Sequence, residues 1–316
     1  MRRNIALLVM ALAVAMALVG CRPLFEDDAV SISVYTTFYP LYALTEAVIG
    51  DVPDIELHQL VQPQDGCLRS YQISDWDKYL LSAGADAVVM GGRGLESFES
   101  ELFNWGEGGP AMAAVLYNLE LYNQDEASAG ESESHLRGAN PHLYMSLKGA
   151  AQMVESISAT LQTFDPRYAQ RYVNNAQSAA DRLDNLMAEM KDLLRPFAGS
   201  QVIIMNEALA YTARDYGFEI AEWIDRESGE ALYDDALEDC LKRLEGSGAR
   251  VALVEKQAPT AFVDAIEAAG FFVARLDILS THSEGKGFDD YIQIQTGNAR
   301  ILFETFERAH AGRNDH

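Results

Sequence analysis

The chain has 316 residues, and its 48 aspartates and glutamates outnumber its 24 lysines and arginines, giving a formal net charge of −24. At about 150 residues per domain this length predicts two domains, and an apolar content of 48% excludes global disorder. A surface that binds nucleic acid has to be basic, so the charge excludes a nucleic-acid partner and favours cations.

The first twenty residues have the pattern of a secretory signal. Arg2 and Arg3 precede an apolar run from Ile5 to Val19, which is shorter than the roughly 20 residues of a membrane-spanning helix. The end of this run, with Gly20 and Cys21, resembles a bacterial lipobox. Cys21 would then carry the lipid and residues 21–29 would form a tether, which predicts an extracytoplasmic protein, lipid-anchored to the outer face of the cell membrane or periplasmic. The alternative is an ordinary signal that contains a cysteine.

Residues 30–164 alternate strand patterns with helix patterns, as in an α/β lobe. Four strands are expected at Ser31–Phe38, Ile55–Val61, Ala87–Met90 and Met112–Leu121. Helices are expected from Pro40, over Trp76–Leu81 and Leu95–Phe103, and over Leu147–Leu161. Residues 123–138, which include His135, are rich in acidic and small residues and predict an acidic loop.

The longest periodic stretch follows, and a second α/β pattern comes after it. Residues 165–197 predict one long linking helix, and residues 198–311 predict the second lobe. Its strands are expected at Gln201–Met205, Arg250–Val254 and Phe271–Leu276. Its helices are expected at Leu209–Tyr216, Asp234–Leu244, Ala258–Ala269 and Tyr291–Glu307. Cys240 falls on the apolar stripe of its helix and is predicted to lie in the core.

The expected fold class is therefore α/β, with two lobes that each hold a mainly parallel sheet flanked by helices. One long rigid helix joins the lobes. Because ligands of such sheets bind beyond the carboxyl ends of the strands, the binding site is expected in a cleft between the lobes.

Six short segments, in order along the chain, carry a resemblance to a known family. They are Thr36–Tyr42 with Gly50-Asp51, Asp86–Val89 with Gly92 to Glu96, Asn140–Tyr144, Tyr211–Gly217, Leu276-Asp277, and Tyr291 with Asn298. Together they resemble the solute-binding lipoproteins of zinc and manganese ABC importers. The resemblance implies capture of a divalent transition metal outside the membrane by a monomer that delivers it to an ABC permease. It also implies that His142 and Asp277 are metal ligands.

The chain departs from the family at the first of the four ligands, which the resemblance places as a histidine two residues before a tyrosine, in a Pro-His-x-Tyr run. Alignment on Tyr71 puts Arg69 at that position, and a guanidinium has no lone pair for a metal. Cys67 lies two residues earlier on the same loop. Its thiolate is a good zinc ligand, although an incidental loop thiol, or a bridge to Cys240, are alternatives.

The third ligand is altered as well. Alignment on Tyr211 and Gly217 puts Asn206 at that position, with Glu207 beside it. A carboxylate suits zinc or manganese better than a neutral amide oxygen, while Asn206 could cap the following helix and Glu207 could be a solvated residue of its first turn.

The predicted ligand set is Cys67, His142, Glu207 and Asp277, with Asn206, Glu255 and Arg69 as alternates. The thiolate favours Zn²⁺ over Mn²⁺. His142 could instead be structural, Asp277 could cap a turn, and Arg69 could pair with one of the carboxylates.

Two other functions compete with simple metal capture. A member that has lost it could hold an anionic ligand or a metal chelate through Arg69, His142 and Asn206, since arginine grips carboxylates well. An extracellular enzyme is disfavoured, because the sequence contains neither a His-Glu-x-x-His nor a Gly-x-Ser-x-Gly motif. We therefore predict a binding protein that is not an enzyme.

If Cys67 is a ligand, Cys67→Ser should weaken zinc binding far more than His135→Ala, which changes a histidine of the acidic loop. The dissociation constants of both variants, measured by competition with a chelator, check this. Equal zinc affinities in the two variants would remove Cys67 from the site.

Overall fold

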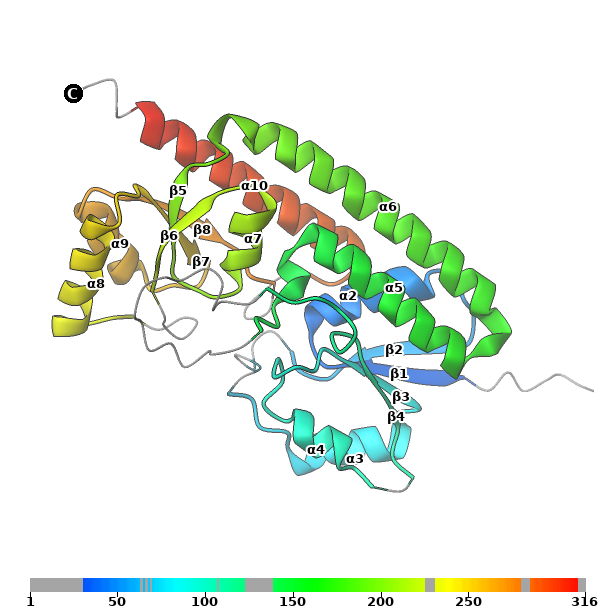
Figure 1. Ribbon diagram of the computed structural model, residues 1–316. Coiled ribbons are helices and arrows are strands. Elements are labelled where there is room, and N and C mark those ends of the chain that lie inside the picture. Colours follow the sequence, from blue (N-terminus) through cyan, green and yellow to red (C-terminus); the bar gives the residue numbers. More distant parts are fainter. Residues whose placement is uncertain are drawn as a thin grey trace, which may run out of the picture.

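The computed structural model describes residues 31–62, 65, 68, 70–106, 108–122, 139–224, 231–279 and 285–311. These residues form two four-stranded parallel sheets, each flanked by helices (Figure 1). Within the described part of the chain, no helix combines the length and apolarity needed to cross a membrane. The predicted signal and Cys21 lie outside the described residues.

The first sheet has the strand order β2-β1-β3-β4. Its elements are β1 (Ile32–Thr36), α2 (Tyr39–Ile49), β2 (Ile55–Gln59), α3 (Asp75–Gly84), β3 (Ala87–Met90), α4 (Glu99–Phe103) and β4 (Ala111–Ala114). All four residues of β3 are buried, as expected for a central strand covered on both faces. α3 begins with a capping box between Ser74 and Asp77, which satisfies amide groups that the first helical turn leaves open.

The second sheet has the order β6-β5-β7-β8, which repeats the order of the first. Its elements are β5 (Gln201–Ile204), α7 (Leu209–Asp215), β6 (Glu219–Trp223), α8 (Asp234–Gly246), β7 (Val251–Glu255), α9 (Thr260–Ala268) and β8 (Phe272–Leu276). β7 is buried along its whole length. Cys240 of α8 is only 3% exposed, which confirms the predicted core position.

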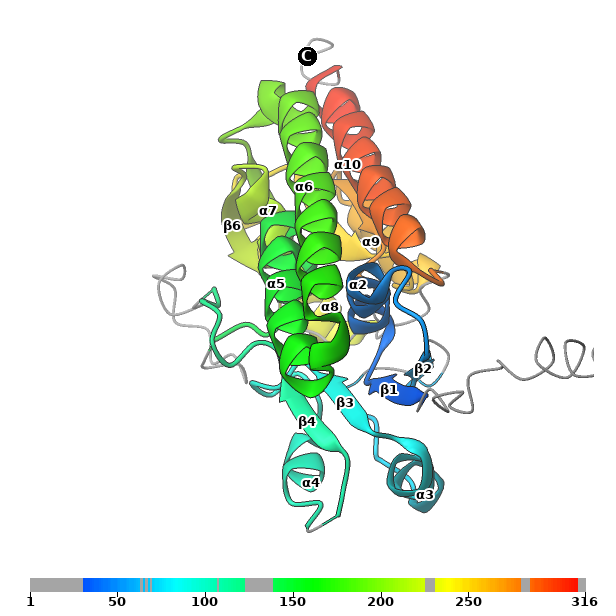
Figure 2. The same ribbon diagram turned by 90° about the vertical axis from the view of Figure 1, so that its right-hand side faces the viewer.

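Three long helices form a layer that spans both lobes: α5 (Leu147–Phe164), α6 (Ala169–Leu194) and α10 (Phe288–Ala311). Figure 2 shows α5, α6 and α10 side by side, with α2 between α6 and the first sheet. The buried stripe of α6 recurs every three or four residues and includes Tyr172, Ala176, Leu183 and Leu194, as helical periodicity requires. The predicted long connecting helix is confirmed, with short 3₁₀ turns at both ends.

Three elements differ from the sequence prediction. The strand β6 was not predicted, because its half-buried sequence carries two glutamates and lies at the sheet edge. The helix expected over 95–103 begins only at Glu99, since the backbone amides of Gly91 and Gly92 bind the carboxylate of Glu96 and hold a turn there. The strand expected over 112–121 ends at Ala114, after which the chain turns, with Leu119 N donating to Leu116 O.

Residues 140–147, which lead into α5, are hydrogen-bonded by side chains of the second lobe. From α7, Tyr211 Oη donates to Asn140 O at 2.8 Å and Asp215 accepts from Leu147 N at 3.1 Å. From α10, Tyr291 Oη donates to Tyr144 O at 2.6 Å. Burial raises the pKa of Tyr211 to about 12, so this phenol stays protonated as a donor at neutral pH.

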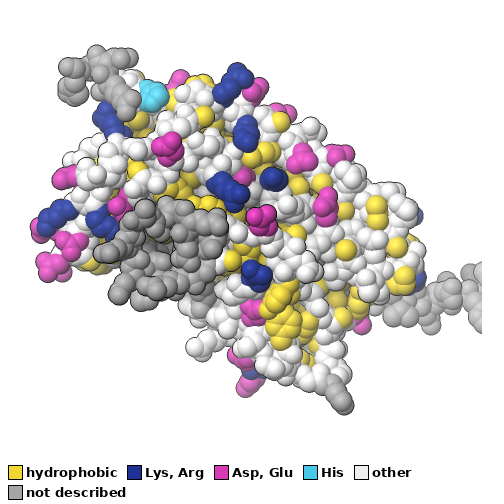
Figure 3. Space-filling view, in the orientation of Figure 1, with side chains coloured by type: hydrophobic (Ala, Val, Ile, Leu, Met, Phe, Trp, Pro, Cys, Tyr) yellow, Lys and Arg dark blue, Asp and Glu magenta, His cyan; other side chains and the backbone are white. Residues whose placement is uncertain are grey.

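A cavity of about 240 Å³ borders this contact and is lined by Lys148, Lys191, Arg214 and Asp215, among others. Lys and Arg side chains gather near the middle of the face drawn in Figure 3. Burial raises the pKa of Asp215, while hydrogen bonds from Ser146 and Leu147 and the charges of Lys191 and Arg214 oppose that rise. The basic side chains therefore offset the cost of placing a carboxylate between the lobes.

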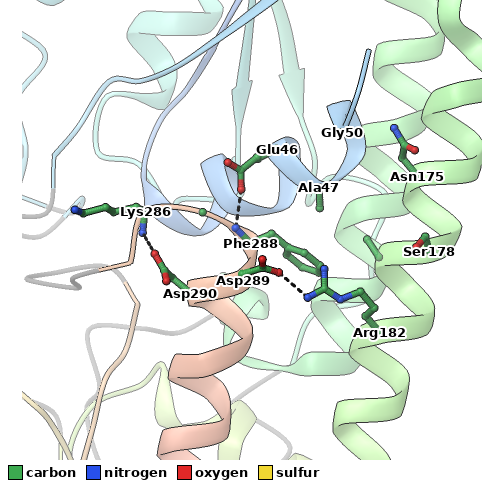
Figure 4. A pocket seen from close by; sticks show the side chains of 12 residues that line it. Glu46, Ala47, Gly50, Asn175, Ser178, Arg182, Lys286, Phe288, Asp289 and Asp290 are labelled. Carbon is green, nitrogen blue, oxygen red and sulfur yellow. Dashed lines mark hydrogen bonds and ion pairs between the residues drawn. The ribbon is translucent and has the colours of Figure 1, made fainter. Parts of the chain in front are cut away.

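A second contact between the lobes holds the first turn of α10. Glu46 of α2 accepts from Phe288 N at 2.7 Å, and Tyr39 Oη donates to Gly287 O at 3.1 Å. Arg182 of α6 forms an ion pair with Asp289 at 2.6 Å (Figure 4). A carboxylate at a helix amino terminus is favourable because it meets unpaired amides and the positive end of the helix dipole.

Removing one of these contacts should cost measurable stability. We expect Tyr291→Phe to lower the free energy of unfolding by about 1 kcal/mol, because it deletes a buried hydrogen bond and leaves Tyr144 O without that donor. Urea unfolding checks this, with Tyr233→Phe as control, since Tyr233 is 70% exposed. Equal stabilities of Tyr291→Phe and the wild type would show that the contact is energetically neutral.

Candidate metal centre

His142 is fixed by the residue two positions before it. Asn140 Oδ1 accepts a hydrogen bond from His142 N at 3.0 Å and lies 2.9 Å from His142 Nδ1. The side chain of His142 is 12% exposed, and its ring meets the edge of Tyr144 at a centroid distance of 5.7 Å. A backbone contact and a ring contact together orient the imidazole at the entrance to the 3₁₀ turn that precedes α5.

Glu207 approaches His142 from the second lobe, just beyond the carboxyl end of β5. Glu207 Oε1 lies 3.5 Å from His142 Nδ1, and the glutamate side chain is 11% exposed. Asn140 Nδ2 also donates to Glu207 O at 2.8 Å, so one asparagine contacts both residues. The structure thus brings together two predicted ligands from different lobes.

Asn206 is engaged within its own turn. Its Oδ1 accepts from Ala208 N at 3.0 Å, and the residue is 8% exposed. An amide oxygen that satisfies a backbone donor at the start of α7 is less available to a ligand than the carboxylate of Glu207. The geometry therefore favours Glu207 over Asn206, and the choice between them stays a prediction.

Asp277 lies just beyond the carboxyl end of β8 and is held from two sides. Asn298 of α10 accepts from Asp277 N at 2.9 Å and donates to Asp277 O at 2.8 Å. Asp277 Oδ1 accepts from Leu279 N at 2.8 Å, and Oδ2 lies 3.8 Å from Lys256 Nζ. Glu255, one of the alternate ligands predicted from the sequence, is fully buried at the end of β7, beside β8.

Tyr39, which follows β1 in the first lobe, reaches the start of α10 in the second lobe, where its Oη donates to Gly287 O. Burial raises the pKa of its phenol above the ordinary value, and the negative charges of Asp290 and Asp277 are among the further causes. The His142–Glu207 pair, which takes one residue from each lobe, lies where the site is predicted.

The loop predicted to supply the first ligand is described only in part. Cys67 and Arg69 lie outside the described residues, so their places in the site stay predictions. Nearby, Leu68 O accepts from Ser97 N at 3.2 Å, and Tyr71 Oη donates to Asp77 at 2.8 Å.

Glu96, next to Ser97, is buried and ties the ends of two central strands together. It accepts from Thr37 Oγ1 at 2.7 Å and from the amides of Gly91 and Gly92. Burial raises its pKa, and these hydrogen bonds oppose that rise.

Among the residues that the structure describes, no three His, Cys, Asp or Glu side chains lie close enough together to hold a metal ion. His142 with Glu207 and Asp277 with Lys256 form two separate pairs. One imidazole and two carboxylates suit several divalent transition metals, and only the thiolate of Cys67 would favour zinc.

Three supporting residues were missed by the sequence analysis: Asn140, Lys256 and Asn298. Asn140 and Asn298 stand in the segments that carry the family resemblance, but their hydrogen bonds depend on the folded chain. Lys256 follows Glu255 directly, and a basic residue beside a candidate ligand was a signal that the sequence offered.

Two parallel α/β sheets joined by a long helix are the architecture of two-lobed solute-binding proteins. The chain belongs to the family described as ZnuA, zinc-uptake complex component A, periplasmic, whose pattern matches residues 34–305. This is a family of transport components that bind solutes outside the cytoplasm. The predicted family membership and fold class are both confirmed.

Curated relatives include the iron-binding protein YfeA of Yersinia pestis, which is 27% identical over 201 residues, covering 63% of this chain and 61% of YfeA. The zinc-binding lipoprotein AdcA of Streptococcus pneumoniae is 24% identical over 228 residues, covering 68% of this chain and 43% of AdcA. The matched regions therefore span less than two thirds of these relatives' own length.

Solved structures share the fold over most of the chain. FpvC of Pseudomonas aeruginosa in complex with Mn²⁺ superposes with a TM-score of 0.74 at 20% identity, covering 88% of this chain and 99% of FpvC. A crystal structure of ZnuA gives a TM-score of 0.69 at 21% identity, covering 87% and 99% of the two chains.

Asn140 should be the residue on which the geometry of His142 depends. We expect Asn140→Ala to lower the free energy of unfolding by about 2 kcal/mol, because it removes hydrogen bonds to His142 N and Glu207 O in a buried place. Thermal or urea unfolding measures this. Asn104→Ala is the control, since its exposed side chain donates to Ser100 O; an equal loss in both variants would contradict the bridging role of Asn140.

Proposed function

We propose that this protein captures a divalent transition metal between its two lobes and delivers it to the permease of an ABC importer. The observation that carries the proposal is the approach of His142 and Glu207 from different lobes at 3.5 Å. A metal bound by both would link the carboxyl end of β5 to the loop before α5. Binding by Asp277 at the end of β8 as well would require the two pairs to move closer together, since no three of these side chains among the described residues lie within reach of one ion. The cargo is zinc in preference to manganese if Cys67 completes the site.

The comparisons support this proposal through the names of the relatives. Relatives are named as zinc-binding or iron-binding proteins, and FpvC is seen with Ni²⁺ and with Mn²⁺. Family members thus differ in their metal, so the preference of this chain has to come from its own ligands. The departures at Cys67, Arg69 and Asn206 are where that preference would arise.

The proposal includes a location and a domain division. We propose that residues 1–20 are removed, that Cys21 carries a lipid, and that the monomer works at the outer face of the membrane or in the periplasm. The name of AdcA as a lipoprotein supports the anchor. The lobes would comprise residues 30–164 and 198–311, with 165–197 as the link.

The second candidate function is capture of an anionic ligand or a metal chelate by Arg69, His142 and Asn206. The Lys256 ammonium beside Asp277 favours it, because it adds positive charge at the same edge of the sheet. The hydrogen bond from Ala208 N to Asn206 disfavours it. Metal binding by the purified protein separates the two functions.

The test is metal content and metal-dependent stability of the protein that begins at residue 22. We expect about one zinc per chain, and a stabilisation of about 2.7 kcal/mol when free zinc is 100 times its dissociation constant. His142→Ala, Glu207→Ala and Asp277→Ala should each abolish most of the thermal shift.

The control is His58→Ala, since His58 is 40% exposed on β2 and lies near Glu56. It should keep the zinc shift of the wild type. A wild-type protein that no divalent ion stabilises would end the metal proposal and direct attention to carboxylate ligands and chelates.

A further inference from the structure

We propose that Lys256 is a built-in competitor for the metal: its ammonium group occupies the cation position at Asp277 until the metal displaces it. This inference rests on the proposed function and concerns the regulation of affinity at the same site. Lys256 would lower the affinity for a divalent ion and speed its release.

The backbone of Lys256 is fixed where it leaves β7. Lys256 N donates to Leu276 O at 2.7 Å, and Lys256 O accepts from the Arg275 guanidinium at 2.8 Å. Both partners belong to β8, the strand that ends beside Asp277. The ammonium group therefore reaches Asp277 from a rigid base.

Asp277 presents one oxygen to this ammonium and has its other oxygen committed. Oδ1 accepts from Leu279 N, and Asn298 holds the backbone on both sides. Oδ2 faces Lys256 Nζ at 3.8 Å. Oδ2 is therefore the oxygen for which a metal and Lys256 would compete.

The two members of this pair differ in exposure. The Asp277 side chain is 12% exposed, whereas that of Lys256 is 52% exposed. The carboxylate stays in place while the lysine can swing into water at little cost, because an ion pair with one exposed partner contributes little stability. The arrangement suits an exchangeable cation better than a permanent structural bridge.

Electrostatic repulsion makes the Lys256 ammonium and a divalent metal exclude each other at Asp277. A divalent ion at Asp277 repels an ammonium a few ångströms away, and the repulsion weakens only when the lysine moves out. The wild type therefore has to break the Lys256–Asp277 contact to bind metal. We expect this competition to reduce the affinity about tenfold.

The Asp277–Lys256 pair and the His142–Glu207 pair are alike in that both place predicted metal ligands next to a side chain of complementary chemistry. His142 faces Glu207 and Asp277 faces Lys256, so each of these three predicted ligands has a partner of complementary chemistry. Such pairing lowers the cost of burying the two carboxylates.

Zinc dissociation constants and release rates of the wild type, Lys256→Met and Lys256→Arg test the proposal, by competition with a chromophoric chelator. Lys256→Met should bind zinc about tenfold more tightly and release it more slowly, while Lys256→Arg, which keeps the charge, should stay near the wild type. Lys242→Met is the matched control: it removes the same charge from α8, where Lys242 pairs with Glu238 at 2.7 Å.

The outcomes separate this inference from the proposed function. If the wild type binds zinc and Lys256→Met has the same affinity and release rate, the competitor role is overturned and metal capture stands. An equal gain in Lys242→Met would assign the effect to net charge and also overturn the role. Zinc binding that appears only in Lys256→Met would support it, and no binding of any divalent ion by either protein would overturn both proposals.

Discussion

The segment from Asn140 to Leu147 is the constraint on which the rest of the site depends. It belongs to the first lobe by sequence, but Tyr211, Asp215 and Tyr291 of the second lobe hydrogen-bond it. Buried hydrogen bonds are costly to leave unmade, so these contacts hold the two lobes together around this segment. The orientation of His142 relative to Glu207 is therefore set by contacts of the fold itself.

Local sequence patterns predicted the architecture because the way each strand or helix is buried determines the spacing of its apolar residues. The all-apolar strand at Ala87–Met90 and the periodic stripe of α6 each have one stable environment, namely the centre of a sheet and the face of a helix layer. The prediction failed where tertiary contacts decide. Residues 91–98 form turns instead of a helix because the Glu96 carboxylate binds two backbone amides. The edge strand β6 lacks the run of apolar residues that would have predicted a buried strand.

The candidate site was predictable only as far as the family resemblance reached. His142 and Asp277 were predicted from the segments that match the family. Glu207 was preferred to Asn206 because a carboxylate oxygen suits a divalent metal better than a neutral amide oxygen. The residues that position them were not predictable, because Asn140 and Asn298 act through hydrogen bonds whose partners are 67 and 21 positions away in the chain. Asn, Lys and Tyr are common on surfaces, and only their placement gives them a role.

The helix α10 has a mechanical consequence for the cleft. Its first turn is tied to Glu46 of the first lobe (Figure 4), Tyr291 bonds to Tyr144 in the segment after His142, and Asn298 holds the backbone of Asp277. One continuous helix thus contacts both halves of the candidate site. Because the same helix contacts both, a displacement of α10 along its axis would move the backbone of Asp277 and the His142 segment together.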